Sequence, residues 1–478
     1  MELGRQPLKE TLASLPPDWP EDPLPSIREL FQAAKTKLVI IDDDPTGNQT
    51  VFNIPVLTQW SIASLRAELK NDLPAFFILT NSRSLPPAQA EEIGAEIGTN
   101  LAEASRLTGR SIAVVSRGDS TLRGHFPGEV DSLVQGLQTE FSAWLLMPAL
   151  IGAGRYTIGD IHYAVEGDWL VPVGETVYAQ DGTFGYQASN LRMWVEEKSK
   201  GRIPAESVAS ISIEDIRLGG PQKVFEILIG LPTGSVVIAN AASQRDFEVV
   251  AKGLLQAEAL GRRYIYRTTA TFIPGRFGLA AYPYLQPQDL ALPKSGGGLL
   301  VIGSYVPKSS QQMQVLFERE PVTRLEVNAG NLLDEKTRNS EIQSVALQAD
   351  RALEQDQDTV MYTSRDLILT DDPDRNLEIG RQVSSGLIEI LKQINVRPRY
   401  LLAKGGITSH DVATKGMGVQ RAMVIGQLCQ GISLWQFGPE TRYKDLIYIV
   451  FPGNVGTSET LADIVRKLRP EQVETKGA

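Results

Sequence analysis

Residues 38–47 read LVIIDDDPTG, an apolar run that ends in three consecutive aspartates and a Pro-Thr-Gly turn. Leu38–Ile41 lacks polar alternation, which is typical of a strand buried on both faces of a parallel sheet. Ligands of such sheets bind at the carboxyl ends of the strands, so Asp43 and Asp44 indicate a binding site there. The alternative for this stretch is an ordinary surface turn with solvated charges.

Similar apolar runs alternate with helical patterns along most of the chain. Further strands are predicted at Phe76–Leu79, Ile112–Val115, Trp144–Met147, Val236–Ala239, Tyr264–Tyr266, Leu299–Ile302, Val360–Tyr362, Tyr400–Ala403 and Leu446–Phe451. Helices are predicted at Ala88–Leu107, Arg245–Leu260, Gln311–Glu318, Leu377–Ile394 and Glu459–Leu468. This alternation predicts an α/β protein with mainly parallel sheets that are flanked by helices.

A chain of 478 residues is too long for one ordinary core, which predicts two domains. The stretch from Tyr282 to Gly298 reads YPYLQPQDLALPKSGGG and has the proline and glycine content of a linker. We therefore expect domains at residues 1–285 and 296–478, with the active site in the cleft between them. The linker is the natural hinge for closing that cleft.

Composition excludes several kinds of partner. The net charge is −10, which disfavours nucleic acid and anionic lipid as main partners. The single cysteine, Cys429, allows no intramolecular disulfide, so a reducing, cytoplasmic location is expected. No segment approaches the roughly 20 apolar residues of a membrane span. The sequence does not fix the oligomeric state, and a homodimer is compatible with it.

Polar side chains follow two more strands of the first domain. Residues 116–125 read SRGDSTLRGH, and Asn81-Ser82-Arg83 follows the strand that ends at Leu79. An arginine pairs with both oxygens of a carboxylate, and glycines allow the backbone close to a ligand. These strand ends predict a site for a small organic acid, with Arg155 as a further contributor; the alternative is a set of polar loops with ordinary ion pairs.

Three glycine-containing turns follow strands of the second domain, each before an expected helix. They are Gly303-Ser304, then Gly405-Gly406-Ile407-Thr408, and Pro452–Gly456. Backbone N–H groups in such turns favour phosphate, so nucleotide binding is predicted. The spacing GxxxxGK[ST] of a Walker P-loop is absent. The alternative is that these glycines only shape the ends of strands and helices.

Taken in order, DDPTG (43–47), DSTLRG (119–124), Gly303-Ser304, GGIT (405–408) and PGNVG (452–456) resemble the motifs of the four-carbon acid sugar kinase family. The resemblance covers residues 38–460, approximately. It implies an acid sugar-binding N-terminal domain and a nucleotide-binding C-terminal domain. It also implies phosphorylation of the terminal hydroxyl of threonate, erythronate or an oxo-tetronate, with ATP and Mg²⁺.

The resemblance also implies functional residues at matching positions. The implied substrate-site residues are Asp43, Asp44, Arg83, Arg117, Asp119, Ser120 and Arg123, with Asp43 or Asp44 as the catalytic base. The implied ATP contacts are Ser304, Gly405, Gly406, Ile407, Thr408 and Gly453, with one more expected near Thr363–Arg365. Phe451 departs from the family pattern, because many members carry a lysine there, and Arg117 stands where lysine is common.

Two stretches lack clear periodicity. Gly152–Gly185 is rich in glycine and tyrosine and is expected to form loops and short antiparallel pieces. The first 25 or so residues are proline-rich and are expected to form a loosely packed arm. Together with Ile161–Tyr186, this arm resembles a longer subgroup of the family.

Two other classes of function remain open. A sugar-acid or nucleotide sensor would keep both pockets without catalysis, and the loss of lysine at Phe451 favours it. A different enzyme, such as an aldolase or dehydratase, would use Asp43 and Asp44 with a metal and would turn over without ATP.

Overall fold

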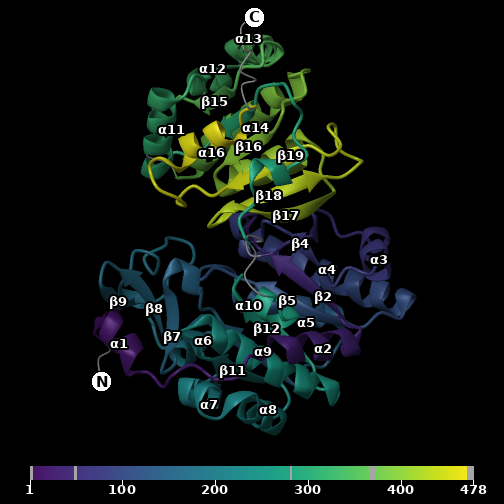
Figure 1. Cartoon of the computed structure of the whole chain (residues 1–478), viewed down its shortest axis with the longest axis vertical. Helices are drawn as coiled ribbons and strands as arrows, with labels where there is room; N and C mark the ends of the chain where they lie inside the picture. Colours follow the sequence, from purple (N-terminus) through teal and green to yellow (C-terminus); the bar gives the residue numbers. More distant parts are fainter. Residues whose placement is uncertain (1–3, 48–50, 280–282, 365–372, 471–478) are drawn as a thin grey trace, which may run out of the picture. The chain divides into compact units, whose positions relative to one another are not determined.

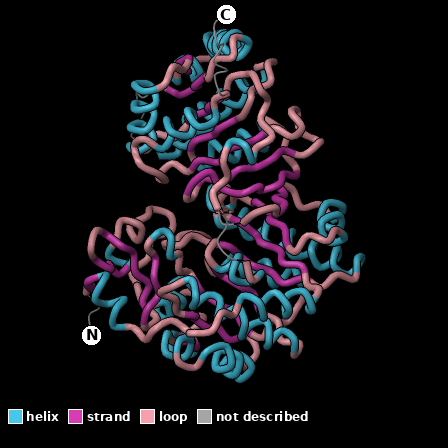
Figure 2. The backbone as a smooth tube through the Cα atoms, viewed as in Figure 1, coloured by secondary structure: helices cyan, strands magenta, loops and turns pink. Residues whose placement is uncertain are grey.

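A computed structural model describes residues 4–47, 51–279, 283–364 and 373–470 of the chain. The chain forms two compact units, Met1–Ala281 and Tyr282–Ala478. Within each unit, strands form a sheet that is flanked by helices (Figure 2). The predicted two-domain α/β architecture is therefore confirmed.

The main sheet of the first unit has the strand order β10-β11-β6-β12-β5-β2-β4-β3, and neighbouring strands in it are parallel where their register is resolved (Figure 1). Its strands are β2 (Lys37–Asp42), β3 (Ile54–Leu57), β4 (Ala75–Leu79), β5 (Ile112–Arg117), β6 (Ala143–Met147), β10 (Ala209–Ile211), β11 (Ser235–Ala239) and β12 (Tyr264–Thr268). The chain leaves β2 toward β3 and β4 on one side and returns to β5 on the other. The carboxyl ends of β2 and β5 thus form the switch point where ligands of open α/β sheets bind.

The first unit also contains the helices that flank its sheets. They are α1 (Leu8–Ser14), α2 (Leu24–Ala34), α3 (Ile62–Lys70), α4 (Pro87–Thr108), α5 (Gly128–Leu137), α6 (Leu191–Lys198), α7 (Ile213–Arg217), α8 (Gly220–Gly230), α9 (Gln244–Ala259) and α10 (Phe272–Phe277). Apolar side chains of α4 and α5 pack on the main sheet, as in the cluster of Val39, Ile97 and Leu133, which are all buried.

A small antiparallel sheet, β1-β9-β8-β7, belongs to the same unit. Its strands are β1 (Gln6–Pro7), β7 (Arg155–Ile158), β8 (Ile161–Glu166) and β9 (Trp169–Pro172). The expected short antiparallel pieces are therefore present. The expectation of a loose N-terminal arm is wrong, because Gln6 pairs with Leu170 in β9 and Leu8 packs on the apolar face of the small sheet.

The sheet of the second unit has the order β17-β18-β19-β16-β13-β15-β14. Its strands are β13 (Leu299–Ile302), β14 (Thr323–Val327), β15 (Thr359–Thr363), β16 (Leu401–Lys404), β17 (Arg421–Cys429), β18 (Ile432–Phe437) and β19 (Ile447–Phe451). β19 to β14 run parallel, whereas β17 and β18 add an antiparallel hairpin at one edge.

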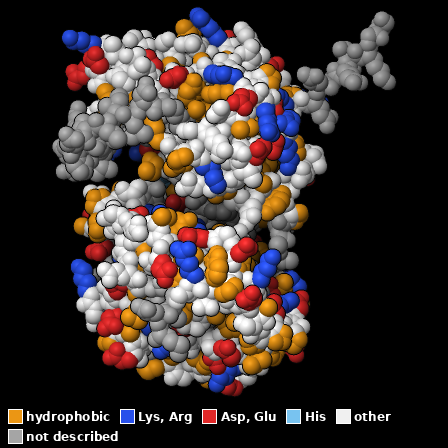
Figure 3. Space-filling model, turned by 90° about the vertical axis from the view of Figure 1, so that its left-hand side faces the viewer, with side chains coloured by type: hydrophobic (Ala, Val, Ile, Leu, Met, Phe, Trp, Pro, Cys, Tyr) orange, Lys and Arg blue, Asp and Glu red, His pale blue; other side chains and the backbone are white. Residues whose placement is uncertain are grey.

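The helices of the second unit alternate with its parallel strands. They are α11 (Pro307–Arg319), α12 (Ala329–Leu333), α13 (Glu335–Glu354), α14 (Pro373–Gln393), α15 (Gly406–Asp411) and α16 (Thr460–Leu468). In both units, no helix of the described residues is long and apolar enough to cross a membrane. Acidic and basic side chains are interspersed over the face shown in Figure 3, unlike the continuous basic stripe that nucleic-acid binding uses.

Candidate functional site

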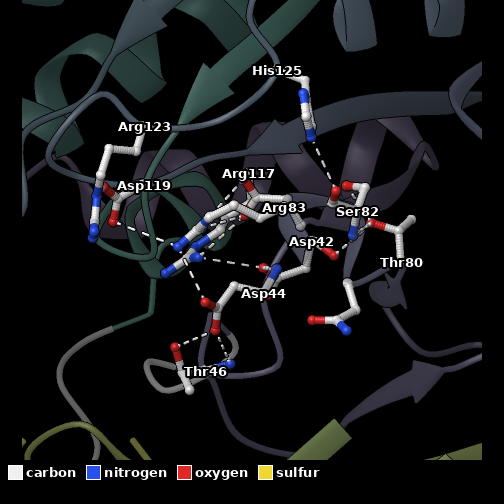
Figure 4. Close-up of polar contacts among 12 residues, drawn as sticks. Asp42, Asp44, Thr46, Thr80, Ser82, Arg83, Arg117, Asp119, Arg123 and His125 are labelled. Carbon is white, nitrogen blue, oxygen red and sulfur yellow. Dashed lines mark hydrogen bonds and ion pairs between the residues drawn. The ribbon is translucent and has the colours of Figure 1, made fainter. Parts of the chain in front are cut away.

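Acidic and basic side chains from three strand ends meet in the first unit (Figure 4). Asp42 ends β2, Arg117 ends β5, and Arg83 lies in a single 3₁₀ turn, Ser82–Ser84, that follows β4. The three strands are neighbours in the sheet, with β2 in the middle. Parallel pairing places their carboxyl ends at one edge, as the sequence predicted.

Arg83 joins the carboxylates of two different loops. Its guanidinium lies 2.5 Å from an oxygen of Asp43, 3.1 Å from Asp44 and 3.7 Å from Asp119. Burial alone would raise the pKa of Asp44 and of Asp119, but Arg83 heads the charges that lower both below their ordinary values. Arg83 thereby fixes the loop after β2 against the loop after β5.

Arg117 pairs with the buried carboxylates of the same cluster. Its Nη1 lies 3.4 Å from Asp42 and 3.7 Å from Asp43, and its side chain is 7% exposed. Burial, reinforced by the charges of Asp43 and Asp44, raises the pKa of Asp42 to about 7 against the opposing pull of Arg117. Asp42 therefore holds a proton more readily than an ordinary aspartate does.

The turn after Asp42 is shaped around its carboxylate. Oδ1 of Asp42 accepts the backbone N–H of Asp44 at 3.2 Å, and Asp44 in turn accepts the N–H of Thr46 at 2.8 Å. A Cβ at Gly47 would lie 2.1 Å from Oδ2 of Asp42, so a side chain there would displace the carboxylate. Glycine is thus required at position 47 of the DDPTG motif, because the Asp42 carboxylate lies too close for a side chain to fit.

The DSTLRG loop is closed by its own side chains. Asp119 accepts a hydrogen bond from Nε of Arg123 at 2.9 Å and another from the hydroxyl of Thr121. Gly124 has a φ of +128°, a conformation that a residue with a side chain rarely adopts. Ser120 lies in the same loop, and its carbonyl oxygen is 2.8 Å from Nε2 of His162 in β8.

Arg267 in β12 is a member of the cluster that the sequence analysis did not include. Its Nη1 donates to Ser116 at 2.9 Å, and its Nη2 lies 4.0 Å from Asp43. A Cβ at Gly118 would lie 2.4 Å from the guanidinium carbon of Arg267. The available signal was a charged residue directly after the apolar and aromatic run Tyr264–Tyr266, within the same strand.

The small antiparallel sheet brings a further arginine to the DSTLRG loop. Arg155 at the start of β7 lies 5.2 Å from the ring centroid of Tyr178 and donates to its hydroxyl at 3.1 Å. Arg123 lies 5.4 Å from the same ring and 3.8 Å from Asp181. Among the described residues, no carboxylate lies within 4 Å of the Arg155 guanidinium, so its charge is not balanced by an ion pair.

Ser82, His125 and Glu129 support the turn that carries Arg83. Ser82 donates to the Glu129 carboxyl at 2.5 Å, and a ring nitrogen of His125 lies 3.1 Å from the carbonyl oxygen of Ser82. Burial raises the pKa of Glu129 and lowers that of His125, so both side chains favour their neutral forms. The sequence analysis did not assign these residues to the site.

The predicted glycine turns converge within the second unit. Ser309 in α11 donates to Ser304 at 3.1 Å and to the carbonyl oxygen of Gly453 at 3.3 Å. Gly405 has a φ of +110°, and a Cβ there would lie 3.1 Å from Cβ of Ser304. The turns after β13, β16 and β19 therefore touch one another and begin at neighbouring strand ends.

The remaining predicted ATP contacts lie around the same turns. Gly406, Ile407 and Thr408 form the first turn of α15, and Ile407 is 59% exposed. Of the stretch near Thr363–Arg365, Thr363 ends β15 and is buried, whereas Arg365 lies outside the described residues.

The part of the chain that the structure describes offers no ready-made metal cage. Within residues 4–47, 51–279, 283–364 and 373–470, no group of three or more His, Cys, Asp or Glu side chains is placed to hold a metal ion. Asp43, Asp44 and Asp119 are instead bound by arginines. The residues present do not match a protein-held Mg²⁺ site.

The fold and the two polar strand edges define a two-domain α/β protein with a sugar-binding unit and a nucleotide-binding unit. Residues 38–276 match the family described as a sugar-binding N-terminal domain, and residues 299–461 match the nucleotide-binding C-terminal domain. The chain belongs to the four-carbon acid sugar kinase family, whose members pair these two domains.

Two solved structures share the fold of this chain. A Haemophilus influenzae protein of the DUF1537 family is 16% identical, with a TM-score of 0.61 over 90% of this chain and 99% of that one. A Salmonella typhimurium LT2 protein described as a candidate tRNA synthase is 17% identical, with a TM-score of 0.65 over 90% and 98% of the two chains. At these identities the similarity shows the fold alone. No protein with a curated description matches the chain.

Proposed function

We propose that the protein is an ATP-dependent kinase that phosphorylates the terminal hydroxyl of a four-carbon sugar acid, such as threonate, erythronate or an oxo-tetronate. The observation that carries this proposal is the cluster of Asp43, Asp44, Arg83 and Arg117 at the carboxyl ends of β2, β4 and β5, in a chain that also contains a nucleotide-binding domain. Phosphoryl transfer depends mainly on positioning and on charge, and the cluster supplies both.

Recognition of the acid is assigned to Arg123 and Arg155. Arg83 and Arg117 are already paired with aspartates, so their role is to hold those aspartates in place. Arg155 has no ion-pair partner among the described residues. Arg123 pairs with Asp119 at 2.9 Å, but it is 30% exposed, more than Arg83 or Arg117, and it contacts the same Tyr178 ring as Arg155. A substrate carboxylate would balance this charge.

The acceptor hydroxyl is oriented by Asp43 or Asp44, and one of them accepts its proton. Asp44 has the lowered pKa of a carboxylate held by arginines, which suits it to accepting a hydrogen bond rather than to keeping a proton. Asp43 is nearer the centre of the cluster, within 4.0 Å of Arg83, Arg117 and Arg267. Substitution of each aspartate separately distinguishes the two roles.

The nucleotide is assigned to the converging turns of the second unit. Backbone N–H groups of Gly405, Gly406 and Gly453 would bind the ATP phosphates, with Ser304, Ile407 and Thr408 around them. A Mg²⁺ ion would arrive with the phosphates, because the described residues provide no cage for it. The proposed domains are residues 1–285 for the acid and 296–478 for the nucleotide, and the single cysteine fits a cytoplasmic location.

The test is ADP formation by the full chain with each four-carbon sugar acid in turn. We expect ADP release that depends on the acid, and a loss of at least about 100-fold in Asp43→Asn, since a positioned base contributes on the order of 10²–10⁴. The exposed Asp168→Asn variant is the matched control and should keep wild-type turnover. Turnover without ATP, or full activity of Asp43→Asn, would contradict the proposal.

A second candidate is a binding protein of the same fold that has lost catalysis. The observation in its favour is that Arg83 holds both Asp43 and Asp44, so neither aspartate is free of an ion pair. This candidate predicts that the acid and ATP both raise the melting temperature of the protein while no ADP forms.

A further inference from the structure

Lys404 is a buried lysine at the end of β16, directly before the Gly405-Gly406 turn. It is 0% exposed and pairs across the sheet with Phe451 of β19. Its Nζ lies 3.7 Å from the centroid of the Phe451 ring and donates to the carbonyl oxygen of Pro452 at 3.2 Å. A second, longer bond of 3.5 Å reaches the carbonyl oxygen of Gly453. The amine therefore lies against the Pro452–Gly456 turn, at the end of the strand that leads into the Gly405-Gly406 turn.

The charge of this amine is not balanced by an acid of the described residues. Among the described residues, no carboxylate lies within 4 Å of Nζ. Burial, together with the charge of Lys308 near the start of α11, lowers the pKa of Lys404 to about 7. An amine in this position is only partly protonated near neutral pH.

The position of Lys404 also affects the interpretation of phenylalanine at position 451. A lysine at position 451 would have put a charge at the end of β19, and phenylalanine removes it. The neighbouring strand β16 puts an amine over the ring of that phenylalanine instead. Positive charge at these turns thus comes from the adjacent strand, which weakens the argument that Phe451 marks a loss of catalysis.

We propose that Lys404 is the counter-charge of the nucleotide phosphates, and that a triphosphate bound at the turns of Gly405 and Gly453 draws one proton from the solvent onto its amine. The inference depends on the proposed nucleotide site. The physical reason is that an anion close to a buried amine favours the charged form, because Coulomb energies grow as the dielectric constant falls. The proton comes from the buffer, and no bond between heavy atoms changes.

Proton uptake makes the affinity for triphosphate depend on pH. With one coupled proton, the affinity of the wild type falls by at most tenfold for each pH unit above 7, as required by linkage between the two binding equilibria. The amine acts through its charge, so it positions and stabilises the phosphates without touching the transferred group.

The experiment is calorimetric titration of the full chain with ATP, and separately with inorganic tripolyphosphate, at pH 8 without Mg²⁺. Each titration is done in two buffers with different enthalpies of protonation, because the difference in heat reports the number of protons taken up. We expect uptake approaching one proton for the wild type. Lys404→Met should abolish the uptake and weaken binding at least tenfold, whereas Lys404→Arg, which stays charged, should bind without uptake.

Lys444→Met, which removes an exposed lysine of the same unit, is the matched control and should behave as the wild type. Cooperative thermal unfolding of each variant verifies that it is folded. Binding by the wild type without proton uptake, or uptake that persists in Lys404→Met, overturns the inference and leaves the proposed function standing. Absence of binding of both ATP and tripolyphosphate to the wild type overturns the nucleotide site itself, and the inference with it.

Discussion

At the scale of single residues, Asp42 and Lys404 are two ionisable groups of opposite charge that the fold buries. Asp42 is 1% exposed at the end of β2, and among the described residues its Oδ2 has no hydrogen-bond partner. Lys404 is 0% exposed at the end of β16. Burial without a full set of partners shifts the pKa of an ionisable group in the direction that favours its neutral form. Each residue therefore makes the stability of the protein depend on pH, and the two dependences have opposite signs.

Asp42→Asn should flatten the pH dependence of stability between about pH 4 and 7. The pKa of Asp42 rises from 3.8 to about 7 on folding, so the folded chain binds more protons in this range than the unfolded chain. The free energy of unfolding of the wild type consequently falls as the pH rises, by at most a few kcal/mol. Urea denaturation of both proteins at pH 4.5 and 7.5 measures the difference; an unchanged slope in the variant would rule out Asp42 as its source.

Lys404→Met should remove a pH dependence of stability that has the opposite sign and lies above pH 7. The pKa of this amine falls from 10.5 to about 7 on folding, so the unfolded chain binds more protons between these values. The free energy of unfolding of the wild type therefore gains a contribution that rises with pH from 7 to about 10, and the variant lacks it. Denaturation midpoints at pH 7 and 9.5 provide the measurement, with Lys444→Met as the control. Equal rises in both variants would show that Lys404 is not the titrating group.

Sequence reasoning found the residues that stand in dense motifs and missed those that stand alone. Asp43, Asp44 and Arg83 were predicted as site residues, and they lie in one cluster. Arg267 was missed, because it is a single charge at the end of an apolar strand, and Lys404 was not assigned a role although it directly precedes the Gly405-Gly406 turn. Their importance follows from what the neighbouring strands bring against them, and strand order is not readable from one sequence.

At the scale of elements, the first unit depends on the close approach of α4 and α5. A Cβ on Gly98 of α4 would lie 2.4 Å from the carbonyl oxygen of Leu133 in α5. A Cβ on Gly136 of α5 would lie 2.3 Å from the carbonyl oxygen of Ala95 in α4. The two glycines allow the helix backbones to touch. Because Glu129 of α5 binds Ser82 beside Arg83, this contact also sets the position of the site.

Gly98→Ala should destabilise the protein although alanine is the better helix former. The added methyl group meets backbone atoms, which cannot yield as a side chain can, and overpacking of this kind typically costs about 1–3 kcal/mol. Gly380→Ala in α14 is the matched control: nothing lies within 4 Å of its Cβ position, so a gain of about 0.5–1 kcal/mol is expected. Thermal denaturation of the two variants should therefore shift in opposite directions. A stabilising Gly98→Ala would disprove the close contact.

The elements that the sequence predicted best are the strands buried on both faces. β13 was predicted with its observed bounds, and β2 was predicted within one residue at each end. β14 and β17 were missed for physical reasons. β14 lies at an edge of its sheet and carries Arg324 and Glu326 on exposed positions. β17 alternates buried and half-buried residues in an antiparallel hairpin, so it lacks the continuous apolar run of the parallel strands.

At the scale of the whole molecule, the proposed chemistry is divided between two units that are each compact. The acid–arginine cluster is built entirely from residues 42–267, and the converging turns from residues 303–456. Which motifs belong to the same unit could be predicted from the sequence, because each unit is one continuous stretch of the chain. Substitutions at the acid site should therefore affect the sugar acid and leave the intrinsic affinity for nucleotide unchanged.

Arg123→Ala tests this division. Loss of the guanidinium removes one of the two cations assigned to the substrate carboxylate, and such a charge-assisted contact is worth about 1.5–3 kcal/mol, or roughly 10- to 150-fold in affinity. We expect the Kd for the sugar acid to rise by that factor while the Kd for ATP in the absence of acid stays within about twofold. Arg106→Ala, an exposed arginine of the same unit, should change neither. Equal losses of affinity for acid and nucleotide in Arg123→Ala would mean that the two sites are not separable. The assignment of one ligand to each unit would then be wrong.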